Sequence, residues 1–242
     1  MTSLGPNLTL SIVHDLGVAI VTGEYAPNKA FPVEEELCEK YGASRSVLRE
    51  AVKMLTAKGL LRARPRQGTR VQPEDQWNLL DPDVLRWMLE RKFSLDLLIQ
   101  FTQVRLAFEP SAAALAAQNP DEEAYAAIAK GIERMLAAGK GDDDPLDSDI
   151  AFHVAILRAS GNPFYAHLRE LIETALRFSI RRTNAYKGVP LANVLEHKRV
   201  ADAIFGHDPA TAERLMRTLI QEALDLMLAE RKKAARAKKQ SA

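Results

Sequence analysis

The feature that most constrains the fold is the short break from Gly42 to Ser44, because it separates two amphipathic stretches by only a few residues. The stretch over 32–41 carries acidic residues in its first turn and ends at Gly42. Ser44 is a good N-cap for the next stretch, 45–58, and Gly59 closes it. The sequence therefore predicts two helices joined by a tight turn.

Two further patterns flank this pair of helices. Upstream, apolar residues recur at helical spacing until Gly23, at positions Leu8, Ile12, Leu16, Ala19 and Ile20. Downstream, segments 60–64 and 68–71 alternate apolar and polar residues around Pro65-Arg66-Gln67, as the strands of a β-hairpin do. Three helices and a β-hairpin predict a compact winged helix-turn-helix domain over residues 1–72.

Basic residues are concentrated in this domain. The formal net charge of the whole chain is only +1, but between Lys40 and Arg70 nine basic residues stand against one acid. Arg45, Arg49 and Lys53 recur at every fourth position, so they form one stripe opposite the apolar face of their helix. A basic run is more often a solvated face, but a helix in this context can enter the major groove of DNA.

The hairpin extends the same surface. Arg66 adds charge near its tip, and Gly68, which lacks a Cβ atom, lets the tip lie close to a sugar-phosphate backbone or in a minor groove. We therefore predict that the following residues contact double-stranded DNA: Ser44, Arg45, Arg49, Lys53, Arg66 and Gly68.

The rest of the chain has a different pattern. Residues 73–81 are polar and predict a linker, residues 82–233 have helical patterning throughout and predict an all-α helical bundle, and the basic end, 234–242, is expected to be disordered. The single cysteine, Cys38, excludes an intramolecular disulfide and a multi-cysteine zinc site. No apolar run reaches the length of about 18 residues that a membrane helix needs, so we expect a cytoplasmic chain without a membrane partner.

A possible metal site lies in the helical half. Asp149 and His153 stand four residues apart on one predicted helix and therefore project to the same side. With His197 from a later helix they could form a facial set of one carboxylate and two imidazoles, which suits zinc best and also nickel, manganese or iron(II). An isolated histidine is more often a packed or surface residue, and His167 and His207 remain open as further donors.

A second group of polar residues could bind an organic acid. Arg105 and Glu109 stand one turn apart in an otherwise apolar helix, either as a plain salt bridge or with the arginine available to a ligand carboxylate. Arg182, Thr183 and Asn184 could add hydrogen bonds to a hydroxylated ligand. Asn162 is a weaker candidate, because Gly161-Asn162-Pro163 also suits a simple turn.

Motifs in both halves resemble the GntR family of bacterial regulators, in its FadR-type branch with a C-terminal FCD ligand-binding domain. The first half carries Pro32-x-Glu34-x-x-Leu37, Tyr41-Gly42-x-Ser44-Arg45-x-x-Leu48-Arg49-Glu50-Ala51 and Arg66-x-Gly68-Thr69-x-Val71. The second half carries Val104-Arg105-Leu106-Ala107-Phe108-Glu109-Pro110, Asp149-Ile150-Ala151-Phe152-His153 and Glu196-His197.

This resemblance implies roles for individual residues. The residues that match Arg45, Arg49 and Gly68 would contact operator DNA, and Arg105 would face an effector cavity. The family usually has a further histidine 22 residues after the one that matches His197, where this chain has Leu219. The resemblance therefore implies at most three protein donors for a metal ion.

The stretch Gln76-Trp77-Asn78-Leu79-Leu80-Asp81 narrows the effector, because it resembles regulators of hexonate and uronate breakdown. We expect a homodimeric transcription regulator, a repressor, that a sugar acid such as galactonate releases from its DNA. Two other functions remain open. One is a metal-dependent enzyme with an appended DNA-binding domain, although no base or nucleophile motif accompanies the metal residues. The other is a helical half that serves only dimerisation, without metal or effector.

Overall fold

The computed structural model describes residues 5–27, 31–64, 68–91, 94–187 and 193–240. The chain divides into two compact units, Met1–Phe93 and Ser94–Ala242. Each unit is described by itself below. The predicted fold class is confirmed, since a small helical unit with one hairpin is followed by an all-α unit.

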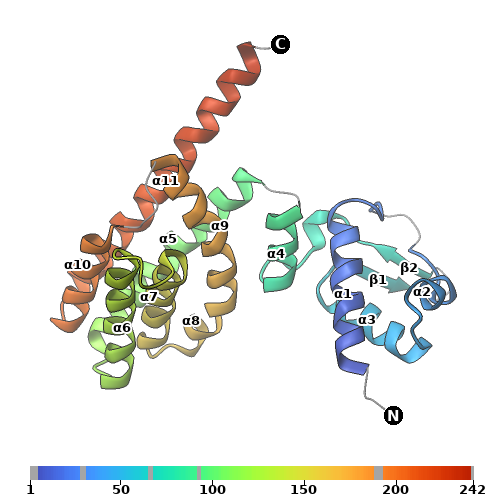
Figure 1. Cartoon of the computed structure of the whole chain (residues 1–242), viewed down its shortest axis with the longest axis horizontal. Helices are drawn as coiled ribbons and strands as arrows, with labels where there is room; N and C mark the ends of the chain where they lie inside the picture. The colour runs from blue at the N-terminus through green and yellow to red at the C-terminus, as the bar shows by residue number, and fades with distance from the viewer. Residues whose placement is uncertain (1–4, 28–30, 65–67, 92–93, 188–192, 241–242) are drawn as a thin grey trace. The chain divides into compact units, whose positions relative to one another are not determined.

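The first unit is a winged helix-turn-helix (Figure 1). Strands β1 and β2 pair antiparallel, with Leu61 opposite Val71 and both side chains buried. The elements of this unit are α1 (Gly5–Val21), α2 (Glu34–Tyr41), α3 (Arg45–Ala57), β1 (Leu61–Arg64), β2 (Gly68–Val71), a short 3-10 helix (Glu74–Gln76) and α4 (Pro82–Arg91).

The turn between α2 and α3 forms as the sequence predicts. Gly42 adopts a left-handed conformation with φ 58° and ψ 30°, which glycine reaches without steric cost. The Ser44 hydroxyl accepts a hydrogen bond from the backbone N–H of Val47 at 3.5 Å and so caps α3. Leu48 and Leu55 on the inner face of α3 are fully buried, which leaves the opposite face of the helix to solvent.

Residues 73–91 belong to the first unit, which differs from the predicted division at residues 72 and 82. Trp87 on α4 is buried against α1: its indole N–H donates to His14 Nδ1 at 3.0 Å, and its ring fills the space beside Gly17. Lys58, which caps α3, places its Nζ 2.9 Å from both Asp81 and Asp83. These contacts attach α4 to the reading helix, so the polar segment before it is not a free linker.

The second unit consists of seven helices in its described part (Figure 1). Helix α7 is central, because it packs against α5, α6 and α9, while α5 also runs along α11. The helices are α5 (Leu95–Gln118), α6 (Glu122–Ala138), α7 (Pro145–Ala159), α8 (Pro163–His167), α9 (Arg169–Lys187), α10 (Val194–Phe205) and α11 (Pro209–Gln240).

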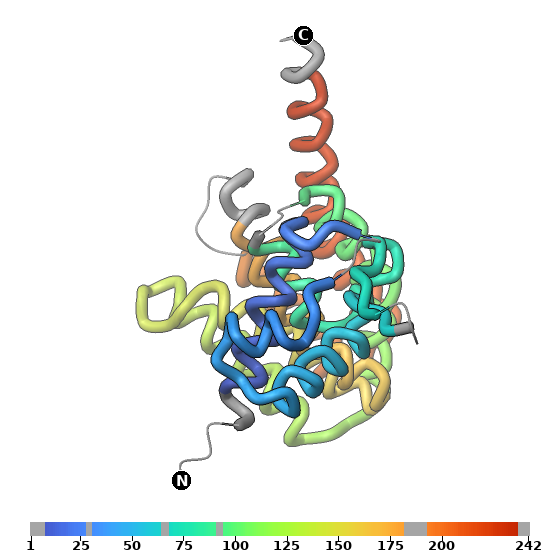
Figure 2. The backbone as a smooth tube through the Cα atoms, turned by 90° about the vertical axis from the view of Figure 1, so that its right-hand side faces the viewer, coloured from blue at the N-terminus to red at the C-terminus, as the bar shows by residue number. Residues whose placement is uncertain are grey.

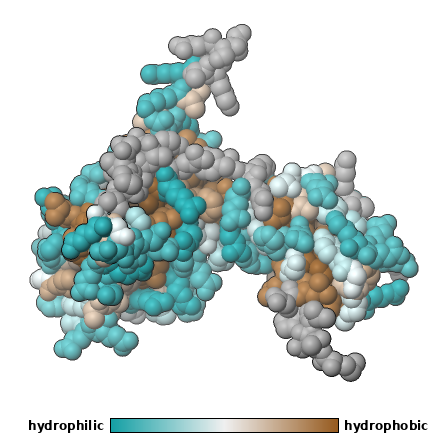
Figure 3. Space-filling view, in the orientation of Figure 1, coloured by the Kyte–Doolittle hydropathy of each residue, from teal (hydrophilic) through white to brown (hydrophobic). Residues whose placement is uncertain are grey.

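Two details differ from the predicted helices. A break at Leu168 separates α8 from α9, which the helical patterning throughout residues 82–233 does not predict. Helix α11 continues to Gln240, so the expected disorder of the tail does not hold for residues 234–240. The C-terminal part of α11 extends beyond the other helices of its unit in both ribbon and tube views (Figures 1 and 2), and the portion of it that Figure 3 colours is mostly hydrophilic. Within the described residues, no helix is both long and apolar enough to span a membrane.

Candidate functional site

The reading helix presents its basic stripe to solvent, as predicted. Arg45, Arg49 and Lys53 are all exposed. The Arg49 Nε lies 3.1 Å from both carboxylate oxygens of Glu34 on α2, and the Lys53 Nζ lies 3.5 Å from Glu50. Such exposed pairs contribute little to stability, so the side chains can exchange these partners for phosphates or base edges at small cost.

The hairpin carries the rest of the basic surface. Arg62 stands directly opposite Arg70 in the strand register, which places like charges side by side on the wing. Gly68 has a left-handed φ of 73°, and an added Cβ atom would meet nothing within 4 Å. Arg66, a predicted DNA contact, lies outside the described residues. Within the described residues, the basic side chains of α3 and of the hairpin, Arg45, Arg49, Lys53, Arg62 and Arg70, are therefore all exposed.

The predicted metal residues come together inside the second unit. Asp149, His153 and His197 are each at most 4% exposed, and one donor atom from each lies within 4.8 Å of the other two. The Nε2 atoms of His153 and His197 lie 3.4 and 3.2 Å from Asp149 Oδ1. The fully buried ring of Phe152 packs edge-on against both imidazoles and keeps water from that side.

The outer nitrogens of both imidazoles are held by acceptors. His153 Nδ1 lies 2.7 Å from Glu109 Oε2, and His197 Nδ1 lies 2.9 Å from the backbone carbonyl of Asn193, one turn earlier at the cap of α10. A carboxylate and a carbonyl can only accept, so the Nδ1 atom of each ring carries the proton. The second nitrogen of each ring, Nε2, then faces Asp149 and can donate a lone pair to a cation once it carries no proton.

Asp149 is the centre of this arrangement. Burial raises the pKa of its carboxyl group, but the neighbouring His197 and His153 lower that pKa below its usual range, so the group is ionised. Its Oδ1 atom is buried and has no hydrogen-bond partner. An orphaned carboxylate oxygen facing two imidazole Nε2 atoms fits a divalent cation, which would satisfy all three donors at once.

The predicted pair of Arg105 and Glu109 is also buried here. The Arg105 Nε donates to Glu109 Oε1, and its Nη2 donates to Oε2 at 3.3 Å. Burial raises the pKa of Glu109, but Arg105 and His153 outweigh burial and lower the pKa to about 2. One ionised carboxylate therefore joins the arginine to the outer nitrogen of a candidate metal ligand.

Comparisons with known proteins cover both units. Residues 8–71 match the family described as "Bacterial regulatory proteins, gntR family", and residues 100–222 match the FCD domain. The galactonate operon transcriptional repressor of Escherichia coli (strain K12) is 35% identical over 215 residues, which are 88% of this chain and 94% of that protein. This chain belongs to the GntR family. The predicted resemblance, including its FCD domain, is thereby confirmed.

Other relatives of this GntR protein support the same family and fold. The Glc operon transcriptional activator of Escherichia coli (strain K12) is 27% identical, over 82% of this chain and 80% of that protein. A solved structure of Lar, which controls the expression of the Listeria monocytogenes agr system, matches 95% of this chain and 98% of its own chain, with a TM-score of 0.58. Its sequence is 17% identical, so this likeness supports the fold alone. The chain is a DNA-binding transcription regulator of the GntR and FCD type, and not an enzyme.

Other predicted site residues of this GntR protein take different places. The Asn162 side chain caps α8 by accepting from the N–H of Phe164 at 3.0 Å, as the turn alternative requires. His167 Nδ1 contacts the carbonyl of Pro163, and His207 lies near Tyr125, so neither is part of the donor group. The backbone of Arg182, Thr183 and Asn184 lies in α9, but their side chains lie outside the described residues.

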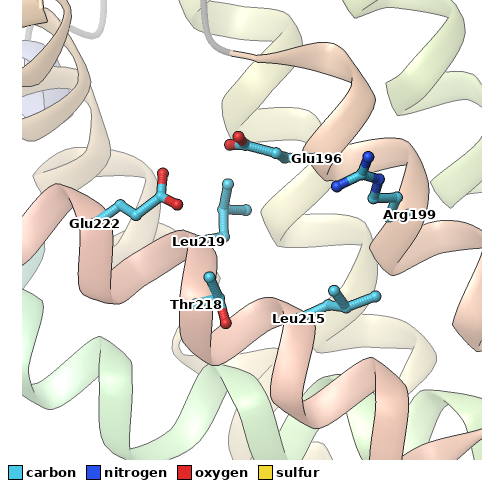
Figure 4. Close-up of a pocket in the computed structure, with 6 residues that line it drawn as sticks. All are labelled: Glu196, Arg199, Leu215, Thr218, Leu219 and Glu222. Atoms are coloured by element: carbon cyan, nitrogen blue, oxygen red, sulfur yellow. The ribbon is translucent and has the colours of Figure 1, made fainter.

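Leu219, where the family would have a further histidine, lines a hollow between α10 and α11 of this GntR protein (Figure 4). Its side chain extends from α11 toward Glu196, with Glu222 on one side and Leu215 farther along the helix. This apolar side chain offers no metal donor. The candidate centre therefore has the three donors Asp149, His153 and His197 in the described part of the chain.

Sequence reasoning missed two groups that orient the imidazoles. It treated Glu109 only as the partner of Arg105, although its second contact is His153, 44 positions away. It also did not find the Asn193 carbonyl beneath His197. Asn193 has a local signal, since asparagine is a preferred N-cap residue, whereas the Glu109 contact requires the packing of α5 against α7.

Proposed function

We propose that this regulator is a repressor whose affinity for its operator is set by a small carboxylic acid bound in the FCD domain together with a divalent metal ion. The observation that carries the proposal is the unpartnered, buried Oδ1 of Asp149 between two imidazole Nε2 atoms. A buried acceptor without a partner is costly, so a ligand that supplies positive charge at this point explains why the group is retained.

Zinc is the ion we favour, because it accepts a mixture of one hard carboxylate and two borderline imidazoles, as do nickel, manganese and iron(II). Three protein donors leave coordination positions free for oxygens of a ligand. When bound, the ion would supply a positive centre for those oxygens. The chain itself contributes the buried ring of Phe152, which packs against both imidazoles, and a fixed cation, Arg105, which Glu109 joins to His153.

A sugar acid such as galactonate fits these features. Its carboxylate suits the fork of the Arg105 guanidinium, and its hydroxyls suit an oxygen-accepting metal centre. The galactonate operon transcriptional repressor is similar to this chain over most of both lengths, which supports the same class of effector here. Arg182, Thr183 and Asn184 on α9 are our candidates for further hydrogen bonds to its hydroxyls.

On the DNA side, we propose a homodimer that presents two copies of α3 to adjacent major grooves of a short palindrome. Arg45 and Arg49 read base edges, Lys53 neutralises a phosphate, Ser44 orients the start of the helix by capping it, and Arg66 and Gly68 bring the wing to the backbone. Effector binding would lower DNA affinity by favouring a second arrangement of the dimer.

The metal half of the proposal can be tested by elemental analysis of purified protein. We expect one equivalent of divalent ion per chain in the wild type and its loss in Asp149→Asn. Asp202→Asn is a matched control, because Asp202 is an exposed acid on α10 that pairs with Lys198, one turn earlier on the same helix. Equal metal content in the wild type and in Asp149→Asn would contradict the assignment.

The regulatory half can be tested by binding of the protein to the DNA upstream of its own gene. Galactonate should weaken binding, while galactose, which has the hydroxyls without the carboxylate, should not. Unchanged DNA affinity with galactonate bound would refute release by the effector. A protein that binds DNA but neither metal nor galactonate would favour the metal-free dimerisation module instead.

A further inference from the structure

Glu109 contacts both Arg105, the proposed partner of the acid's carboxylate, and His153, a proposed donor to the metal ion. One of its oxygens, Oε2, lies 3.3 Å from Arg105 Nη2 and 2.7 Å from His153 Nδ1, while Oε1 accepts from Arg105 Nε. All three side chains are at least 95% buried, so water does not screen the charges between them.

The Arg105 guanidinium is only half used. Glu109 occupies the edge formed by Nε and Nη2, and among the described residues no contact is recorded for Nη1. An arginine offers five donors in a planar fork, so a second carboxylate can bind the free edge while Glu109 keeps the first. Arg105 can therefore hold an effector acid without releasing Glu109.

Binding at that free edge changes the charge that Glu109 presents to His153. An acid carboxylate partly neutralises Arg105, which leaves more of the negative charge of Glu109 to attract the Nδ1–H of His153. A stronger hydrogen bond at Nδ1 makes Nε2 of the same ring a better donor to a cation. The effect also runs in the other direction, because a cation at Nε2 makes the Nδ1–H a stronger donor to Glu109.

We propose that Glu109 is the positioning residue that couples the two ligands, so that the acid and the metal ion bind cooperatively through Arg105, Glu109 and His153. This inference rests on the proposed function, since it requires both ligands to bind. Coupling between sites is reciprocal, so each ligand tightens the other by the same factor. That factor is expected within the common range of about 5- to 150-fold.

The experiment measures the affinity of the full chain for Zn²⁺ by competition with a chelating dye, with and without saturating galactonate. The coupling factor is the ratio of the two dissociation constants. We expect it well above one in the wild type and clearly smaller in Glu109→Gln, which keeps the shape of the side chain and removes its charge. If Glu109→Gln only destabilised the metal site, both dissociation constants would rise together and their ratio would stay at the wild-type value.

Glu173→Gln is the matched control, because Glu173 also pairs with an arginine one turn away, Arg177, but on a partly exposed face of α9. It should keep the wild-type ratio. If Glu109→Gln does not fold, Arg105→Lys provides the second test. It keeps the charge but loses the two-edged fork, so it should bind zinc normally, and at galactonate concentrations that still saturate the variant its ratio should be clearly smaller than in the wild type.

The outcomes separate the two ideas. A wild-type ratio of one with both ligands bound, or a wild-type ratio that persists in Glu109→Gln, overturns the coupling and leaves the proposed function intact. Persistence would mean that the acid acts on the ion by direct contact alone. A wild-type chain that binds neither Zn²⁺ nor galactonate overturns the proposed function, and this inference with it.

Discussion

Replacing Gly17 by alanine should destabilise the first unit, because the place of a Cβ atom is already taken by Trp87. A Cβ at Gly17 would lie 2.3, 2.5 and 2.7 Å from three atoms of the indole ring, whereas carbon atoms in contact prefer about 3.5–4.0 Å. The ring would have to retreat by about 1 Å. It cannot swing away freely, because it is 1% exposed and its N–H is bound to His14.

Overpacking of this kind typically costs about 1–3 kcal/mol. For a unit of this size, each 1 kcal/mol lowers the melting temperature by about 4–8 °C, so the expected decrease is roughly 4–24 °C. Calorimetry of the full chain measures it. Gly139→Ala is the control, because Gly139 has helical backbone angles at the end of α6 in the second unit and should leave the first unit unchanged.

A double-mutant cycle tests the cause. In a Trp87→Leu background the indole atoms are absent, so Gly17→Ala should cost clearly less than in the wild type. An unchanged melting temperature of the first unit in Gly17→Ala would refute the reasoning. So would an equal cost in both backgrounds, since the loss would then come from somewhere other than the contact with Trp87.

Three further predictions concern charge. Lys53→Ala should weaken binding to all DNA sequences alike and reduce the slope of log affinity against log salt by about 1, whereas Arg49→Ala should relax sequence preference. Titrations of specific and non-specific DNA at several salt concentrations distinguish the two variants, and equal effects would contradict the assigned roles. Glu34→Gln should raise affinity for non-specific DNA, because it frees the Arg49 guanidinium; a decrease would show that Glu34 instead holds Arg49 ready for DNA. The hydrogen-bonded Arg134 lowers the pKa of Asp143 to about 2, so Asp143 should stabilise the fold above its ordinary pKa near 3.8 and lose this contribution as pH falls toward 2. In Asp143→Asn the free energy of unfolding should therefore depend less on pH between these values. An unaltered pH dependence would exclude the pair as a contributor.

The features that sequence reasoning predicted are those with local causes. Gly42 and Ser44 determine the turn before α3 through their own backbone and side-chain preferences, and the alternation around residues 65–67 determines the hairpin. The Asp149 and His153 pair follows from helical spacing alone. His197 was included because of the family resemblance, and its place beside Asp149 now has a physical basis in the geometry of α7 and α10.

The features that sequence reasoning missed depend on contacts between residues that are far apart in the sequence. The sequence did not show which unit Trp77 and Trp87 would join. Both are buried in the first unit, where a left-handed Gly59 lets the carbonyl of Gln76 approach. No glycine or proline marks the break at Leu168 between α8 and α9. The link from Glu109 to His153 crosses two helices and could not be read from either.

The attachment of α4 to the reading helix has a practical consequence for the design of hybrid regulators. Lys58, at the end of α3, is held by Asp81 and Asp83, and the indole of Trp87 lies against α1. A DNA-reading module cut at residue 72 would lose both tryptophans and expose the surfaces they cover. A transplantable module therefore has to include α4 and join its new effector domain after Phe93.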